Sequence, residues 1–508
     1  MVRASLLSVS LMLCVAAIAP TARAAEDFFE LTTLPNVGRS VAAQLADFDG
    51  DGRLDLFVGA LTGLPPDDRR LARVYLQAAD GSFPSTPSHV KELPAWTAVY
   101  DVEDVRPDNP GKELLVLVPN GVTVVSLASA SAPTWMLEVP GATTLGPAAD
   151  ERGLESFRIV HRHLGAEPWL LVPQIGEMTA ITGTGEVKAK LSQPRRANYF
   201  ILPPTGLIAL ESNYQIFLDA PKLLLGDIDG DGRNDMASAT RHEIWVFLQR
   251  EDGTFAYEPD QKLKLNLVTP RDHIRGSGGV ATDAGDIDGD GKLDLLVSHV
   301  SGGFTDATTT VNVHLNKGSG WTLESPDQVM TLLGSVSSNA LFDMNRDGTV
   351  ELLRLQAKFG LLDLIQMLVS RDLDLELSIY QHEGQSGFSK NAWVNRKISL
   401  PISFETFRTR GFVPTARVDL NGDGYLDFTS SGAGTELEFY PGSAKGPFRS
   451  KPARQKMSTA GMIEFGDWSG DGLTDFVIFD PHNYDVPVQL GRNLGRLPGT
   501  PASVQAAD

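Results

Sequence analysis

Oxygen-bearing side chains recur at fixed spacing in six nine-residue segments of this chain. Three segments are nearly identical, namely DFDGDGRLD from Asp47, DIDGDGRND from Asp227 and DIDGDGKLD from Asp286. Three more are edited copies, namely DMNRDGTVE from Asp343, DLNGDGYLD from Asp419 and DWSGDGLTD from Asp467. Each has side-chain oxygens at positions 1, 3, 5 and 9 and glycine at position 6. Several oxygens that converge on one point are the ligands that Ca²⁺ prefers.

The spacing predicts one Ca²⁺ site in each of these acidic loops. Oxygens two residues apart meet only where the backbone curls, and glycine tolerates the positive φ of such a turn. Position 7 offers its backbone carbonyl, so its side chain is free to vary from loop to loop. The predicted ligands are Asp47, Asp49, Asp51, Arg53 and Asp55; Asp227, Asp229, Asp231, Arg233 and Asp235; Asp286, Asp288, Asp290, Lys292 and Asp294; Asp343, Asn345, Asp347, Thr349 and Glu351; Asp419, Asn421, Asp423, Tyr425 and Asp427; and Asp467, Ser469, Asp471, Leu473 and Asp475.

Charge supports cations in these loops. Turn formation alone would explain an Asp-Gly pair, but not four aligned oxygens in six copies, because clustered carboxylates repel one another without a cation between them. The four side-chain positions hold 21 acidic residues, and the formal net charge of the chain is −20. The acidity is therefore mainly a metal-binding signature, for up to six structural Ca²⁺ ions, and it argues against nucleic acid as a partner.

The loops also mark a structural repeat. Around each loop lie four short strand patterns separated by turn residues, which is typical of a propeller blade. Two further segments, from Ala98 and from Ser156, keep the strands but lose the loop. Glu113 and Glu167 lie near position 9 of these remnants, and no metal is assigned there. The eight units lie about 60 residues apart on average.

The sequence therefore predicts an all-β fold, a β-propeller of seven or eight four-stranded antiparallel blades, with eight favoured. The last unit has a weak fourth strand, whereas residues 28–34 (FFELTTL) resemble one. We expect this N-terminal strand to pair with the C-terminal strands and close the ring, because closure removes exposed sheet edges.

With these loops and strands, the chain resembles the FG-GAP or VCBS repeat family of calcium-binding propellers, whose best-known member is the head of integrin α subunits. It resembles a bacterial secreted type of this family. The resemblance implies that each loop joins the first two strands of a blade and binds Ca²⁺. It holds fully for the loops at Asp47, Asp227 and Asp286. It is weaker at Asp343 and Asp419, where asparagine takes position 3, and weakest at Asp467, where Ser469 is a poor ligand.

The N-terminus predicts export. Residues 1–24 read as a secretory signal peptide, with Arg3 in the n-region, an apolar segment from Leu6 to Ala19 and a cleavage motif that ends at Ala24. The only cysteine, Cys14, falls inside this segment. Residues 25–508 form one predicted propeller domain without a transmembrane segment. The expected location is periplasmic, secreted or cell-surface, and the expected state is a monomer.

Three functions fit this sequence. The first is a secreted, non-catalytic binding or adhesion module for a protein or glycan ligand, the second a polysaccharide-active, lyase-like enzyme, and the third a structural envelope component. A ligand is expected on the face opposite the acidic loops, where residues 59–73, 271–273 and 299–310 should lie, with a helix within 358–373. His161 and His163 face the same side of a strand, but no acid at suitable spacing completes a metal site.

Overall fold

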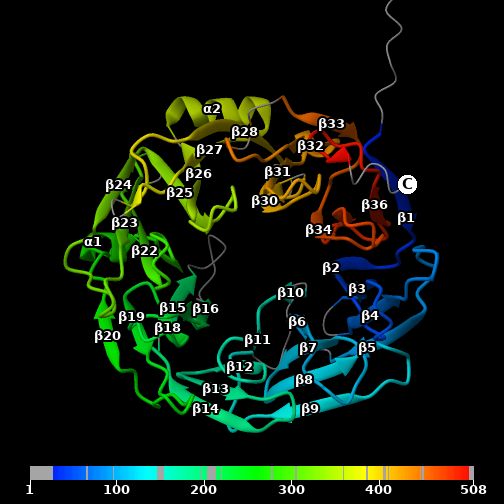
Figure 1. Ribbon diagram of the computed structural model, residues 1–508, viewed down its shortest axis with the longest axis horizontal. Coiled ribbons are helices and arrows are strands. Elements are labelled where there is room, and N and C mark those ends of the chain that lie inside the picture. The colour runs from blue at the N-terminus through cyan, green and yellow to red at the C-terminus, as the bar shows by residue number, and fades with distance from the viewer. Residues whose placement is uncertain are drawn as a thin grey trace, which may run out of the picture.

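The computed structural model describes residues 27–502, apart from 65–66, 95–96, 146–153, 196, 203–212, 219, 276–277, 304–305, 359, 385–386, 404–407, 410, 447 and 449–450. The expected signal peptide, residues 1–24, lies outside the described residues. The described chain forms eight antiparallel blades arranged in a ring (Figure 1). This confirms the predicted all-β propeller and decides for eight blades over seven.

The first seven blades follow one another along the chain. Blade 1 contains β2 (Arg39–Ala46), β3 (Asp55–Thr62), β4 (Arg69–Tyr75) and β5 (His89–Leu93), and blade 2 contains β6 (Val99–Glu103), β7 (Glu113–Val118), β8 (Gly121–Ser126), β9 (Thr134–Glu138) and β10 (Glu155–Ser156), of which β10 is parallel to β6. Blade 3 contains β11 (Val160–His161), β12 (Trp169–Gln174), β13 (Glu177–Ile181) and β14 (Val187–Ser192). Blade 4 contains β17 (Lys222–Gly226), β18 (Asp235–Ala239), β19 (Glu243–Phe247) and β20 (Gln261–Lys264). Blade 5 contains β21 (Val280–Gly285), β22 (Asp294–Ser301), β23 (Thr308–His314) and β24 (Gln328–Leu333). Blade 6 contains β25 (Ser335–Phe342), β26 (Glu351–Lys358), β27 (Asp372–Tyr380), β28 (Val394–Ser403) and β29 (Arg408–Thr409). Blade 7 contains β30 (Thr415–Val418), β31 (Asp427–Ser430), β32 (Glu436–Tyr440) and β33 (Ala453–Lys456).

The eighth blade joins the two ends of the chain. It contains β34 (Met462–Gly466), β35 (Asp475–Phe479), β36 (Val488–Asn493) and β1 (Phe29–Leu34). β1 pairs antiparallel with β36, and in Figure 1 the two strands lie side by side at opposite ends of the colour range. The predicted closure of the ring by the N-terminal strand is confirmed.

Few of the described elements are not strands of a blade. A hairpin of β15 (Ala197–Leu202) and β16 (Asn213–Leu218) precedes blade 4. α1 (Pro270–Arg275) precedes blade 5, η2 (Gly432–Gly434) is a short 3₁₀ helix in blade 7, and α2 (Leu361–Ser370) connects β26 to β27. α2 confirms the helix expected within residues 358–373. Neither described α-helix is long and apolar enough to cross a membrane.

The core lies between blades. The second strands β3, β7, β12, β18 and β35 are buried along nearly their whole length, because neighbouring blades cover both of their faces. These strands therefore read as apolar runs such as LLVLV rather than as alternating patterns. Outer strands such as β24 alternate in exposure.

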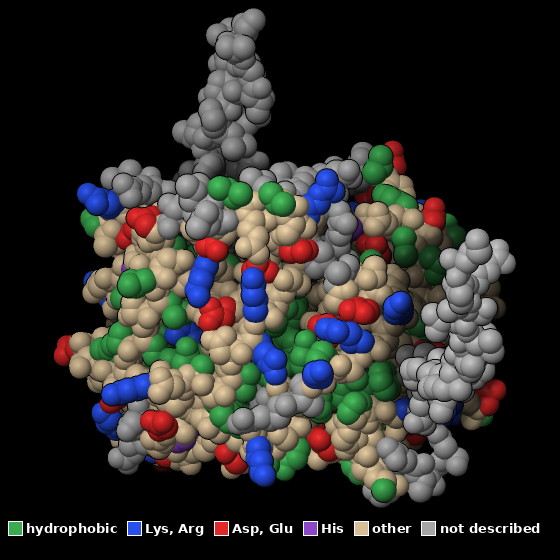
Figure 2. Space-filling model, turned by 90° about the horizontal axis from the view of Figure 1, so that it is seen from above, with side chains coloured by type: hydrophobic (Ala, Val, Ile, Leu, Met, Phe, Trp, Pro, Cys, Tyr) green, Lys and Arg blue, Asp and Glu red, His purple; other side chains and the backbone are tan. Residues whose placement is uncertain are grey.

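The outer wall near α2 carries mixed charge. Figure 2 shows acidic and basic side chains interspersed on this side of the ring. Ion pairs here join Lys358 to Glu376 at 2.6 Å and Lys397 to Asp374 at 2.7 Å. The surplus negative charge of the chain is therefore not gathered on this side.

Candidate functional site: the acidic loops

All six acidic loops join the first strand of a blade to the second, at the connections β2–β3, β17–β18, β21–β22, β25–β26, β30–β31 and β34–β35. The first strands run in the same direction around the ring, so the loops share one end of it. The fold thus brings every predicted ligand into the same structural position in its blade.

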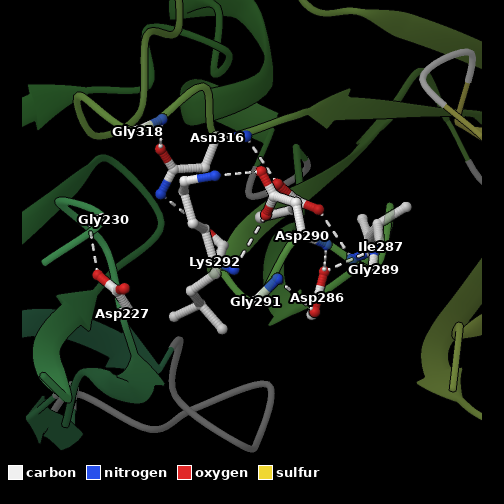
Figure 3. A network of polar contacts seen from close by, with 12 residues as sticks. Asp227, Gly230, Asp286, Ile287, Gly289, Asp290, Gly291, Lys292, Asn316 and Gly318 are labelled. Carbon is white, nitrogen blue, oxygen red and sulfur yellow. Dashed lines mark hydrogen bonds and ion pairs between the residues drawn. The ribbon is translucent and has the colours of Figure 1, made fainter. Parts of the chain in front are cut away.

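The carboxylate at position 1 shapes each loop. In blade 5 the two oxygens of Asp286 accept the backbone N–H groups of Gly289 at 2.8 Å and Gly291 at 2.9 Å (Figure 3). Gly291 has φ of 85° with no heavy atom near its would-be Cβ, so backbone conformation alone demands glycine there. In the loop at Asp343, Arg346 takes a φ of 54° at position 4, at a cost of about 1 kcal/mol.

The three unedited loops bring carboxylates together. Oxygens within 4.8 Å of one another come from three acids in each loop, namely Asp47, Asp49 and Asp55; Asp227, Asp229 and Asp235; and Asp286, Asp288 and Asp290. Burial and repulsion between neighbouring acids raise the pKa of the position 3 carboxyls, Asp49, Asp229 and Asp288. The Oδ1 atom of Asp288 is buried and has no hydrogen-bond partner among the described residues. An oxygen-only donor set with an unpartnered buried oxygen fits a hard divalent cation.

The side chain at position 7 of the three unedited loops is basic and forms an ion pair within its own loop. Arg53 pairs with Asp51, Arg233 with Asp231, and Lys292 with Asp290. Each basic side chain is held by the acid at position 5 of its own loop. This basic side chain offsets one of the four negative charges of its loop. A divalent cation would cancel two more.

The acid at position 9 is the buried anchor of each loop. Asp294 accepts the N–H of Ile287 at 2.8 Å and that of Asn316 at 2.6 Å, so it ties the loop to the end of the third strand. Burial raises the pKa of all six anchor carboxyls. The pKa is about 6 for Asp55, Asp235 and Asp475. It is about 7 for Asp294, Glu351 and Asp427.

Comparisons with known proteins agree with this geometry. Residues 227–297, which include the acidic loops of blades 4 and 5, match the FG-GAP-like repeat. The protein is an eight-bladed β-propeller, and this part of it matches the FG-GAP-like repeat. No curated protein matches the chain in sequence.

Several solved structures resemble the chain at low sequence identity. An Agrocybe aegerita lectin that recognises terminal N-acetylglucosamine is 13% identical, with a TM-score of 0.36 over 71% of this chain and 80% of the lectin. The V. cholerae biofilm matrix protein Bap1 is 9% identical, with a TM-score of 0.34 over 92% of this chain and 89% of Bap1. The Dos1 propeller is 8% identical, with a TM-score of 0.34 over 91% of this chain and 95% of that chain.

Blades 2 and 3 depart from the FG-GAP-like repeat in different ways. In blade 2, Glu113 is buried and accepts the N–H of Val105 at 2.9 Å, as the anchor acid does in the six loops. In blade 3, Glu167 is not an anchor, because it is exposed and pairs with Lys188 at 3.1 Å. Trp169 begins the second strand there instead. The anchor acid persists in blade 2 although the position 3 acid is lost, so its role is structural as well.

Adjacent blades are linked through their loops. In Figure 3, the loop of blade 5 lies beside that of blade 4. The side-chain amide of Asn316 donates to the carbonyl of Ile228 at 2.6 Å, and the N–H of Leu293 donates to the carbonyl of Asp227 at 2.7 Å. Thus blade 5 holds the backbone of the loop in blade 4.

The same amide link recurs around the ring. Gln77, Gln249 and Asn493 donate at 2.5–2.7 Å to carbonyls of the preceding blade, those of Trp468, Leu164 and Leu420 respectively. Sequence reasoning missed these residues. The signal was a glutamine or asparagine at or just after the end of the third strand, as in VYLQ, VFLQ and VHLN.

Asn316→Ala is expected to lower the free energy of unfolding by about 2 kcal/mol, because it leaves the buried carbonyl of Ile228 without its donor. Lys317→Ala is the matched control, since this adjacent side chain is exposed and its pairing with Asp327 is worth little. Urea unfolding measures both. Equal stability of the two variants would contradict the link.

Calcium binding is expected to release protons at pH 6 but almost none at pH 8. In the metal-free protein the anchor carboxyls have a raised pKa, so between about pH 4 and 7 the folded state holds more protons than the unfolded state. Their contribution to stability therefore falls as pH rises through this window. A cation needs the ionised form and expels the protons. Titration calorimetry in two buffers of different ionisation heat measures the release, and equal release at both pH values would contradict the assignment.

The other sequence candidates do not form a comparable site in the described residues. His161 is buried, which lowers its pKa to about 4, and no acid cluster includes it. Asp272 accepts the hydroxyl of Thr269 at 2.5 Å at the start of α1, and the side chain of His273 lies outside the described residues. In the segment 59–73, buried Arg70 lies 3.4 Å from Asp68. These contacts are structural.

Proposed function

We propose that this protein is a secreted, calcium-stabilised β-propeller that binds a protein or glycan ligand and catalyses no reaction. The observation that carries the calcium assignment is the convergence of three carboxylates in each unedited loop, with a buried, unpartnered oxygen on Asp288. The ligands are oxygens alone, as Ca²⁺ requires. We assign up to six ions, and the predicted signal peptide supports an exported location where Ca²⁺ is abundant.

The ions would act in the framework rather than in a reaction. Positions 1, 3, 5 and 9 and the position 7 carbonyl would hold the cation, and the anchor acid at position 9 also connects the site to the second strand. Bound Ca²⁺ would offset the negative charge that these carboxylates bring together in each loop. The opposite end of the ring, built from the β-strand 2–3 connections, is left for a ligand.

A glycan array combined with a lyase assay tests the functional part. We expect the calcium-loaded protein to retain specific glycans or a protein ligand and to produce no unsaturated uronate from pectin or alginate. Turnover that persists when the acidic loops are intact and is abolished by a substitution outside them would contradict the non-catalytic proposal and favour the lyase-like alternative.

A further inference from the structure

A cavity lies at the end of the ring away from the acidic loops. It has a volume of about 820 Å³ and lies where the innermost strands β17, β21 and β25 of blades 4, 5 and 6 begin. A volume of this size suits a small ligand or the end of a chain. The lining is polar, with hydroxyls and an amide from Thr282, Ser298, Ser337 and Asn339. Its apolar members are small or aliphatic, and none of the described lining residues is aromatic.

Positive charge lines this cavity, although the chain as a whole is strongly negative. Lys222 and Arg241 are in the wall, opposed by the single carboxylate of Asp283. Lys222 Nζ donates to the carbonyl of Thr282 at 2.8 Å and pairs with Asp283 at 3.0 Å. Arg241 Nε donates to the carbonyl of Gly278 at 2.9 Å. These contacts use two of the three N–H donors of Lys222, so one remains for a ligand.

A third cation lies directly behind the wall. Arg354 on β26 is 1% exposed, and its Nε donates to Asn339 Oδ1 at 3.1 Å while Nη2 lies 3.5 Å from Ser337 Oγ. Asn339 in turn donates to Ser298 Oγ at 2.8 Å. Both groups that accept from Arg354 therefore line the cavity.

Arg354 has no carboxylate partner among the described residues. The other large buried arginine, Arg70, has Asp68 at 3.4 Å, whereas Arg354 contacts only neutral groups and the ring of Tyr380. An uncompensated buried charge destabilises a fold by several kcal/mol. The chain has many more acidic than basic residues, yet Arg354 lies beside a polar cavity without a described carboxylate partner. The missing counter-charge is thus best supplied from the cavity side.

We propose that this cavity binds an acidic saccharide, with the sugar carboxylate contacting Lys222 and Arg241 and the sugar hydroxyls contacting the serine, threonine and asparagine side chains of the wall. Arg354 is a positioning residue, which orients Asn339 and Ser337 and adds its charge to the field in the cavity. The inference rests on the proposed function as a binding module and names its ligand class.

The test uses the full, calcium-loaded protein and a glucuronate tetrasaccharide as the probe, with affinity measured by calorimetry. Lys222→Gln and Arg241→Gln are each expected to weaken binding about tenfold, the loss of one charge-assisted contact. Lys317→Gln is the control, because this exposed lysine follows the third strand of blade 5 at the loop end of the ring, and it should bind as the wild type does.

Arg354→Met separates a role in binding from a role in packing. We expect about tenfold weaker binding with an unchanged or higher melting temperature, because an unpaired buried charge is replaced by an apolar side chain of similar length. Arg354→Lys, which keeps the charge, should retain most of the affinity. A lower melting temperature with unchanged affinity would overturn the assignment.

Matched ligands test the chemical class. A glucose tetrasaccharide bound as tightly as the glucuronate one would overturn the role of the carboxylate, and tetraglutamate bound as tightly would overturn the role of the sugar. Retention of only neutral glycans on the array, unaffected by the cavity variants, would overturn this inference while leaving the proposed binding function intact.

Discussion

Removal of calcium with a chelator is expected to lower the melting temperature of this propeller by about 8 °C. At about 1 mM Ca²⁺ and a Kd of about 0.1 mM, each site contributes roughly 1.4 kcal/mol, so that six sites contribute about 8 kcal/mol. A folded chain of this length loses about 1 kcal/mol of stability per degree near its midpoint. The effect is comparable with the whole stability of many proteins, about 5–15 kcal/mol.

Calorimetric scans with and without chelator measure this shift in melting temperature. Variants show whether the shift arises in the acidic loops. Asp288→Asn should remove part of the calcium-dependent gain and leave the chelated protein nearly unchanged. Asp80→Asn is the matched control, because this exposed acid lies in a hairpin outside the acidic loops and bonds only to Ser82. A midpoint that is the same with and without chelator would mean that the loops are turns without ions.

Phe29→Ala is expected to lower the free energy of unfolding by about 3–5 kcal/mol, the usual result of emptying a buried aromatic site. Phe29 is fully buried on the closing strand β1, and its ring lies 4.8 Å from that of Phe476. Gln455 from blade 7 accepts the N–H groups of Phe28 and Phe29, each at 2.8 Å. The Phe29 ring and the Gln455 amide thus hold β1, the strand that closes the ring, in place.

Leu31→Ala on the same strand is the control, because this side chain is 37% exposed. Denaturant unfolding of both variants measures the difference. Removal of residues 27–34 should go further and expose β36 as an unpaired edge, which favours association between copies. Similar stability of the Phe29 and Leu31 variants, with a truncated chain that stays monomeric, would contradict closure by β1.

The architecture was predictable from the sequence because its signals are local and repeated. Each acidic loop lies at the same point of a four-stranded unit, so the spacing from Asp47 to Asp467 counted the blades. Residues 28–34 carried a fourth-strand pattern that the last unit lacked. The helix within 358–373 followed from its 3.6-residue periodicity, and α2 confirms it.

The contacts between blades were not predictable in the same way. The amide of Asn316 meets the carbonyl of Ile228 across 88 residues of chain, and no local pattern states which backbone a side chain will reach. Glu167 resembled an anchor acid by spacing alone, yet the loop of blade 3 is built differently and leaves it exposed. The pairing of Arg53 with Asp51 depends on side-chain direction, which the spacing of ligands does not reveal.

Calcium stoichiometry tests the central claim most directly. Equilibrium dialysis of the purified chain against about 1 mM Ca²⁺, a concentration near typical extracellular affinities, followed by metal analysis, gives the number of ions per protein. The account predicts at least three ions, from the loops at Asp47, Asp227 and Asp286, and at most six, with one ion lost in a triple Asp→Asn variant of any single unedited loop. Fewer than three ions per chain would contradict it.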